Sequence, residues 1–110
     1  MKGTVLYDIK DGIAILTVDN PPVNPLSDGV RAGLYECLVK AEEDSSVKGL
    51  VLTGKGRAFI GGADISEFGG NGEGISLNDV FNKLESCSKP VVAAINGFAL
   101  GGGLETALCC

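Results

Sequence analysis

Three consecutive glycines followed closely by a carboxylate form the most distinctive chemical pattern in this chain. In the stretch NGFALGGGLE, residues 96–105, Gly101–Gly103 follow an apolar run and stand just before Glu105. Glycine loses more backbone freedom on folding than any other residue, so three in a row indicate that another group must approach the main chain closely. A carboxylate at that place can act as an acid/base group beside a reacting carbon. It can also do no more than stabilise the first turn of a helix, by about 0.3–1 kcal/mol.

A second segment, GGAD at residues 61–64, resembles this arrangement. Both glycine-rich segments follow a short apolar stretch, at 50–53 and 91–95, that is expected to form a β-strand, and both are expected to open a helix. The first backbone N–H groups of a helix have no partner within it and favour negative charge. If the two strands are neighbours in one sheet, both sets of N–H groups can converge and form an oxyanion hole for a carbonyl oxygen. The spacing leaves a second interpretation open, in which the glycines only permit tight turns and close helix–strand packing.

The elements that would hold these segments alternate between strands and helices, which predicts an α/β architecture with buried parallel pairing. Asp11-Gly12 has the composition of a hairpin turn, Ser27 is a suitable N-cap, and strand 50–53 is apolar enough to be buried on both faces. We predict that residues 1–110 belong to a single domain, of which they are the N-terminal fragment. Its expected elements are strands 5–9, 13–18, 50–53 and 91–95, helices 26–44 and 77–86, a helical turn at 64–67, a helix that starts near Gly102, and loops at 54–62 and 69–74.

The composition argues against several classes of function. The 110 residues carry a net charge of −5 with no basic stripe, so nucleic acid is not an expected partner. Histidine is absent and the four cysteines form no CxxC pair, so no metal site is expected and the thiols are expected to be reduced. No stretch approaches the roughly 20 apolar residues of a membrane span and none resembles a signal peptide, which predicts a cytosolic or organelle-matrix location. The chain stops at Leu108-Cys109-Cys110, inside an expected helix, and is interpreted as the N-terminal portion of a longer protein.

Four motifs, in this order and spacing, resemble the crotonase (enoyl-CoA hydratase/isomerase) superfamily over essentially the whole chain. They are NPPVN at 20–24, FIGGADI at 59–65, KPVVAAING at 89–97 and ALGGGLE at 99–105. The first and the last are most similar to the N-terminal hydratase part of multifunctional β-oxidation enzymes, in which a 3-hydroxyacyl-CoA dehydrogenase follows on the same polypeptide. The resemblance implies a spiral of ββα turns that works as a homotrimer or within one multifunctional chain.

The resemblance also implies roles for individual residues. The backbone amides of Ala63 and Gly102 would form the oxyanion hole on the thioester oxygen of an acyl-CoA substrate. Glu105 would be one of two catalytic glutamates, and the second would lie in a segment beyond Cys110, so the 110 residues alone are expected to be inactive. The residues expected to line the coenzyme A site are Val23, Ala63, Asp64, Ile65, Ser66 and Gly102.

The implied activity is enoyl-CoA hydration in fatty acid β-oxidation, the addition of water across the 2,3 double bond of a trans-2-enoyl-CoA. Coenzyme A belongs to the substrate, so the hydratase step needs no cofactor, and NAD is expected only with a downstream dehydrogenase domain. The alternatives are another activity of the superfamily, such as enoyl-CoA isomerase or acyl-CoA hydrolase, and a non-catalytic acyl-CoA-binding module. The expected location is the cytoplasm of a bacterium, or the peroxisome if the source is a eukaryote.

Overall fold

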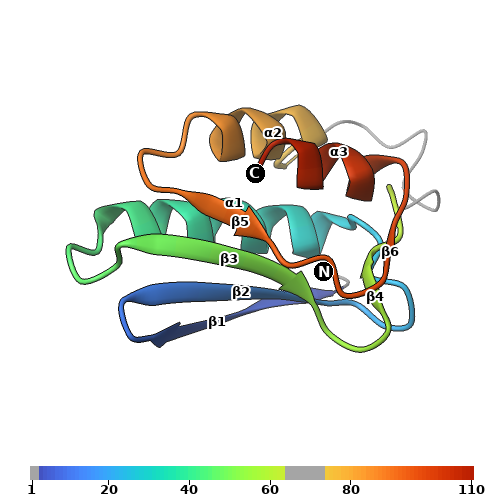
Figure 1. The fold of residues 1–110 in the computed structure, drawn as a ribbon. Helices are drawn as coiled ribbons and strands as arrows, with labels where there is room; N and C mark the ends of the chain where they lie inside the picture. Colours follow the sequence, from blue (N-terminus) through green and yellow to red (C-terminus); the bar gives the residue numbers. More distant parts are fainter. Residues whose placement is uncertain (1–2, 64–73) are drawn as a thin grey trace.

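A four-stranded sheet with helices packed on it forms the frame of the molecule (Figure 1). The computed structural model describes residues 3–63 and 74–110. In chain order the elements of these residues are β1 (Thr4–Lys10), β2 (Ile13–Asp19), α1 (Asp28–Glu43), β3 (Gly49–Gly54), β4 (Ala58–Ile60), α2 (Leu77–Glu85), β5 (Val91–Ala93), β6 (Phe98–Ala99) and α3 (Gly102–Leu108). Helices combined with parallel strands confirm the predicted α/β class.

The strands of the main sheet follow the order β1-β2-β3-β5. β1 and β2 form the predicted antiparallel hairpin, in which the turn residues Asp11 and Gly12 both have positive φ, 52° and 80°. A turn with positive φ at both central residues has the twist that the flanking strands need. β2 pairs with β3, and β3 pairs with β5, both in parallel. The two main-sheet strands that precede the glycine-rich segments are therefore neighbours.

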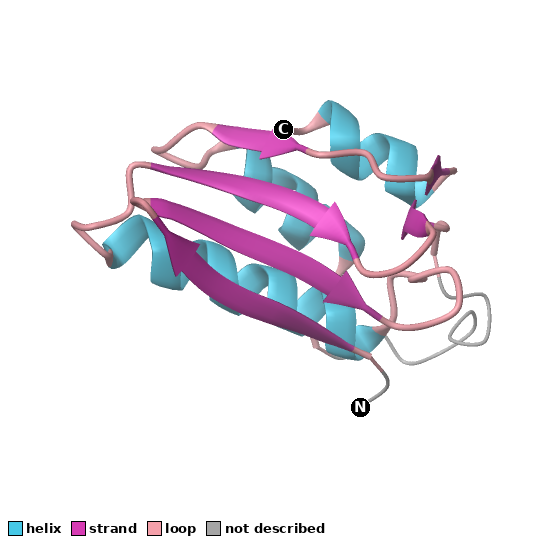
Figure 2. Ribbon diagram, turned by 60° about the horizontal axis from the view of Figure 1, so that its bottom comes forward, coloured by secondary structure: helices cyan, strands magenta, loops and turns pink. Residues whose placement is uncertain are grey.

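The core lies between the sheet and the helices (Figure 2). Along β2, residues alternate between fully buried and half-buried. The prediction that strand 50–53 is buried on both faces is wrong, because Leu50 and Leu52 are buried whereas Val51 and Thr53 are only half-buried. In the part of the chain that the structure describes, the helices cover one face of the sheet and leave the other open (Figure 2).

The loop predicted at 54–62 contains a short strand, β4, that the sequence pattern does not indicate. All three residues of β4 are buried, and β4 pairs in parallel with the two-residue strand β6. Three apolar residues are too few to show the period of a strand. The strand predicted at 91–95 is also shorter than expected, since β5 ends at Ala93 and the chain then runs on to β6.

The first two helices begin at side-chain caps. Ser27 is the N-cap of α1, as predicted, and its hydroxyl accepts a hydrogen bond from the backbone nitrogen of Val30 at 3.3 Å. Ser76 caps α2 in a capping box, in which the Asp79 nitrogen donates to the Ser76 hydroxyl at 3.0 Å and the Ser76 nitrogen donates to the Asp79 carboxylate at 2.9 Å. Both helices lie within one or two residues of their predicted bounds.

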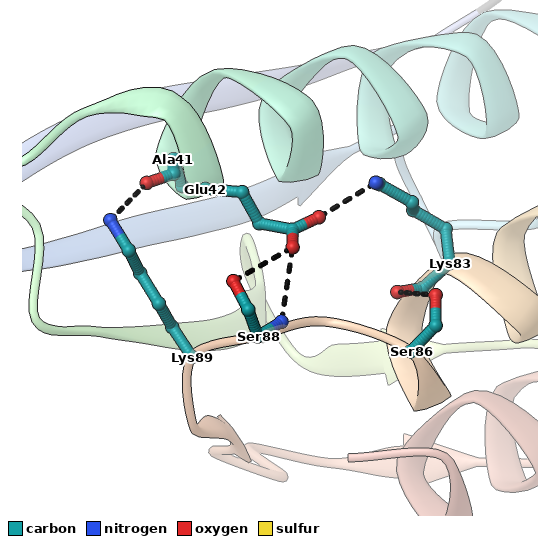
Figure 3. Close-up of polar contacts among 6 residues, drawn as sticks. All are labelled: Ala41, Glu42, Lys83, Ser86, Ser88 and Lys89. Atoms are coloured by element: carbon teal, nitrogen blue, oxygen red, sulfur yellow. Dashed lines mark hydrogen bonds and ion pairs between the residues drawn. The ribbon is translucent and has the colours of Figure 1, made fainter.

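A cluster of polar contacts fastens the segment before β5 to the C-terminal end of α1 (Figure 3). The carboxylate of Glu42 accepts hydrogen bonds from the backbone nitrogen and the hydroxyl of Ser88, both at 3.0 Å, and pairs with the ammonium of Lys83 at 2.7 Å. The bonds from Lys83 and Ser88 lower the pKa of Glu42 from 4.5 to about 2. Lys89 donates to the carbonyl oxygen of Ala41 at 2.7 Å, which also accepts a hydrogen bond from the backbone nitrogen of Asp44 at 3.4 Å.

Candidate active site

The two glycine-rich segments meet at one point of the molecule, where Ala63 lies beside Gly102. A Cβ built on Gly102 would stand 3.5 Å from the backbone nitrogen of Ala63 and 3.7 Å from the carbonyl carbon of Gly62. A Cβ on Gly62 would in turn stand 3.3 Å from the carbonyl oxygen of Leu100. The parallel pairing of β3 with β5 and of β4 with β6 aligns the ends of these strands. Segments 61–63 and 100–103 therefore lie side by side.

The backbone N–H groups of Ala63 and Gly102 donate to no acceptor among residues 3–63 and 74–110. The groups next to them are paired. The Leu26 nitrogen donates to the carbonyl oxygen of Gly62 at 2.7 Å, and the Gly103 nitrogen donates to the carbonyl oxygen of Leu100 at 2.8 Å. Two unpaired donors on a backbone that neighbouring bonds hold in place can stabilise negative charge on an oxygen atom.

Each of the three consecutive glycines has its own structural reason. Gly101 is the N-cap of α3 and has a φ of +52°, a conformation that disfavours any residue with a side chain. A Cβ on Gly103 would collide with the carbonyl group of Ile60, because α3 packs directly on β4. The interpretation in which glycines permit a turn and close packing therefore holds for Gly101 and Gly103. Gly102 also allows close packing, since a Cβ there would stand 3.0 Å from Cδ1 of Leu26, and in addition it leaves the space beside the Ala63 nitrogen clear.

Glu105 lies in the first turn of α3, three residues after Gly102, which corresponds to about 4.5 Å along a helix axis. Its side chain is exposed, and its carboxylate has no hydrogen bond or ion pair within the described part of the chain. The expected acid/base group thus stands one helical turn from one of the two unpaired N–H groups.

The structure places one further residue of the expected coenzyme A site. Val23 is 44% exposed and lies against Gly61, since a Cβ on Gly61 would stand 2.6 Å from the carbonyl oxygen of Val23. Val23 is therefore close to the segment that carries Ala63. Outside the described residues lie Asp64, Ile65, Ser66, the helical turn predicted at 64–67 and most of the loop predicted at 69–74.

Two asparagines hold the strand that leads to Ala63, and the sequence pattern assigns no role to either. Asn24 and Asn96 belong to the motifs NPPVN and KPVVAAING. Each side chain contacts three backbone carbonyl oxygens of residues 54–59 at 2.9–3.2 Å. No local signal in the sequence indicates these contacts, because they join residues that are 31 to 42 positions apart.

The cysteines at the end of α3 have raised thiol pKa values. Burial raises the pKa of the Cys110 thiol to about 11, and burial together with a hydrogen bond to Glu85 raises the pKa of the Cys109 thiol. A thiol with a raised pKa stays protonated at neutral pH. All four cysteines are free. In the described ranges no group of three or more His, Cys, Asp or Glu side chains could hold a metal ion, and no helix has the length and apolar character needed to cross a membrane.

Comparisons with known proteins point to one family. The family model described as enoyl-CoA hydratase/isomerase matches residues 8–110. The chain is 45% identical over 102 residues to a peroxisomal bifunctional enzyme of Danio rerio, covering 93% of this chain and 14% of that protein. It is 43% identical over 105 residues to a probable enoyl-CoA hydratase of Bacillus subtilis, covering 89% of this chain and 41% of that protein.

A solved structure extends the likeness to three dimensions. The crystal structure of a monofunctional enoyl-CoA isomerase from M. smegmatis matches with a TM-score of 0.80 and 36% identity, over 96% of this chain and 46% of that one. The chain spans less than half the length of each of these relatives. The expected crotonase-type fold and the resemblance to bifunctional enzymes are confirmed. With a family match that includes both glycine-rich segments and the contact between them, this chain belongs to the enoyl-CoA hydratase/isomerase family, the crotonase superfamily.

Proposed function

We propose that the protein to which this chain belongs is an enoyl-CoA hydratase, which adds water across the 2,3 double bond of a trans-2-enoyl-CoA in fatty acid β-oxidation. The observation that carries the proposal is the contact of Ala63 with Gly102, one helical turn from Glu105. The N–H groups of both residues donate to no acceptor in the described part of the chain. Membership of the family supports an acyl-CoA thioester as the substrate class.

The chemistry needs a site for negative charge. When the oxygen of water bonds to C3, the electron pair of the double bond moves towards the carbonyl group, and the thioester oxygen becomes negatively charged. Two N–H groups next to that oxygen stabilise the charged enolate more than the neutral carbonyl, and so lower the barrier. Glu105 and a second carboxylate of the full-length protein together take a proton from water and return one to C2. Coenzyme A is part of the substrate, and we propose that this step uses no other cofactor.

Hydration of crotonyl-CoA by the full-length protein tests the proposal. Glu105→Gln is expected to lower kcat by about 100-fold or more, since a positioned acid/base group contributes about 10²- to 10⁴-fold. Glu43→Gln removes an exposed carboxylate from α1 and is the matched control with unchanged turnover. Nearly intact turnover in Glu105→Gln would refute the role of Glu105. A full-length protein that hydrates no 2-enoyl-CoA would refute the proposed function.

Isomerisation of a 3-enoyl-CoA to a 2-enoyl-CoA is the second candidate, favoured by the likeness to the M. smegmatis isomerase structure. An oxyanion hole serves both reactions, because both place negative charge on the thioester oxygen. The products separate them, since an isomerase converts 3-enoyl-CoA without forming 3-hydroxyacyl-CoA. Binding of an acyl-CoA by the full-length protein without turnover in either assay would instead favour a non-catalytic binding module.

The likeness to a peroxisomal bifunctional enzyme supports a further part of the proposal. We propose that a dehydrogenase domain of the full-length protein oxidises the 3-hydroxyacyl-CoA product with NAD. Formation of NADH during turnover of crotonyl-CoA tests this part, and hydration without NADH would contradict it. The proposed location is the cytoplasm of a bacterium or the peroxisome of a eukaryote, and sedimentation of the full-length protein distinguishes a homotrimer from a single multifunctional chain.

A further inference from the structure

The buried side chain of Asn24 contacts the start of β4 and the turn before it. Its amide nitrogen lies 3.1, 2.9 and 3.2 Å from the carbonyl oxygens of Lys55, Ala58 and Phe59. Its amide oxygen accepts a hydrogen bond from the backbone nitrogen of Asn20 at 2.9 Å, and its backbone nitrogen donates to the carbonyl oxygen of Asn20 at 2.8 Å. Both polar atoms of this side chain, which is 0% exposed, are thus engaged.

Asn96 contacts the same segment. Its amide nitrogen lies 2.9, 3.1 and 3.2 Å from the carbonyl oxygens of Gly54, Gly56 and Ala58. Its amide oxygen accepts from the backbone nitrogen of Gly54 at 3.1 Å and from the hydroxyl of Thr53 at 3.3 Å. The carbonyl oxygen of Ala58, the first residue of β4, is therefore shared by the two asparagines.

Each asparagine stands shortly before a segment that pairs with the chain between Ala58 and Ala63. Two residues after Asn24, Leu26 forms an isolated parallel bridge with Ala63. Strand β6 begins two residues after Asn96, pairs with β4 and leads on to Gly102. The two asparagine side chains thus join the backbone segment that leads to the N–H group of Ala63 to the segment that leads to the N–H group of Gly102.

From these contacts we propose that Asn24 and Asn96 are positioning residues, which set the N–H group of Ala63 against that of Gly102. The proposal rests on the proposed function, in which these two groups form the oxyanion hole. Loss of one asparagine amide leaves backbone carbonyls without their donor and lets β4 shift, because β4 has only three residues to hold it. A displaced donor matters most in the transition state, where the thioester oxygen is charged, and less in the bound substrate. Loss of either amide therefore lowers kcat more than it raises KM.

Asn96→Ala in the full-length protein is the primary test, because Asn96 is exposed and its loss leaves the buried core intact. We expect kcat for crotonyl-CoA to fall about 10- to 100-fold, while KM stays within a factor of about 2. Asn24→Ala is expected to give the same pattern with a larger loss of stability, since buried carbonyls then lack a donor. Val47→Ala shortens a buried side chain in the connection between α1 and β3, and is the control for lost stability with unchanged kcat.

An Asn96→Ala protein with the kcat of the wild type, or with a change in KM alone, would overturn the proposal. Hydrogen exchange of the peptide 58–63, followed by mass spectrometry on the same proteins, tests the positioning without turnover. Faster exchange is expected in Asn96→Ala and not in Val47→Ala. A wild-type protein without turnover would refute the proposed function, whereas unchanged exchange of the peptide 58–63 in Asn96→Ala would refute the positioning role in either case.

Discussion

The backbone nitrogen of Ala63 lies 3.5 Å from the point at which a Cβ on Gly102 would stand, and Cδ1 of Leu26 lies 3.0 Å from the same point. Leu26 is fully buried, so it has little freedom to move aside. A side chain at residue 102 would therefore fill the space beside the Ala63 nitrogen. The glycine keeps two backbone amides from different parts of the sequence next to each other.

Gly102→Ala in the full-length protein is expected to lower kcat for crotonyl-CoA by about 100-fold, because a methyl group beside the Ala63 nitrogen would hold the thioester oxygen away. The contact with Leu26 is expected to cost about 1–3 kcal/mol of stability. Steady-state kinetics and thermal melting measure the two effects. Gly12→Ala, at a positive φ in the β1–β2 turn, is the control that loses stability without losing turnover. Unchanged kcat in Gly102→Ala would contradict the prediction.

Gly103→Ala is expected to affect stability rather than chemistry. A Cβ at this position would collide with the carbonyl group of Ile60, so α3 would have to move away from β4. We expect the free energy of unfolding to fall by at least about 1–3 kcal/mol. Gly101→Ala is the comparison, since a Cβ there meets nothing within 4 Å in the described chain and is disfavoured only by the φ of +52°. Urea unfolding of the full-length variants ranks their free energies of unfolding. A Gly103→Ala protein as stable as the wild type would disprove the close packing.

Glu42 is expected to make stability depend on pH in the acid range. Hydrogen bonds from Lys83 and Ser88 lower its pKa from 4.5 to about 2, so the folded protein holds the charged carboxylate more strongly than the unfolded chain does. The contribution to stability is complete above pH 4.5 and is lost as the pH falls towards 2. Glu42→Gln should be less stable than the wild type at neutral pH, and the difference should shrink below pH 4.5. Unfolding by urea at several pH values measures this, with Glu43→Gln as the control. A difference that stays constant with pH would count against it.

Residues 1–110 expressed alone are expected to associate and to lack hydratase activity. Apolar side chains of β5, β6, α3 and the connections between them are exposed, among them Phe98 at 60% and Leu108 at 76%. The others in this group are Val92, Ile95, Leu100 and Leu104. Large exposed apolar surfaces promote association, and this one is expected to be covered in the full-length protein. Sedimentation, circular dichroism and a crotonyl-CoA assay test the expectation, and a cooperative melt of a monomer would contradict it.

Much of the local structure is predictable because its signals are local. Asp11-Gly12 predicts the hairpin turn, since both residues tolerate positive φ, and Ser27 predicts the start of α1 through its hydroxyl. The four motifs are sufficient to predict the family. β4 is not predictable in the same way, because its three apolar residues are too few to show a period. The half-buried state of Val51 depends on which face of the sheet the helices cover.

The candidate site is likewise predictable from the sequence only in part. The sequence by itself shows that the segments at 61–64 and 101–105 can stabilise negative charge, because backbone N–H groups at helix starts and a carboxylate in a first turn have suitable properties. The choice of Ala63, Gly102 and Glu105 within them comes from the resemblance to the family. Only the tertiary structure decides that Ala63 lies beside Gly102, and that Asn24 and Asn96 share one carbonyl oxygen behind them. The physical reason is strand order, since the parallel pairing of β3 with β5 and of β4 with β6 brings together segments that a helix separates in the chain.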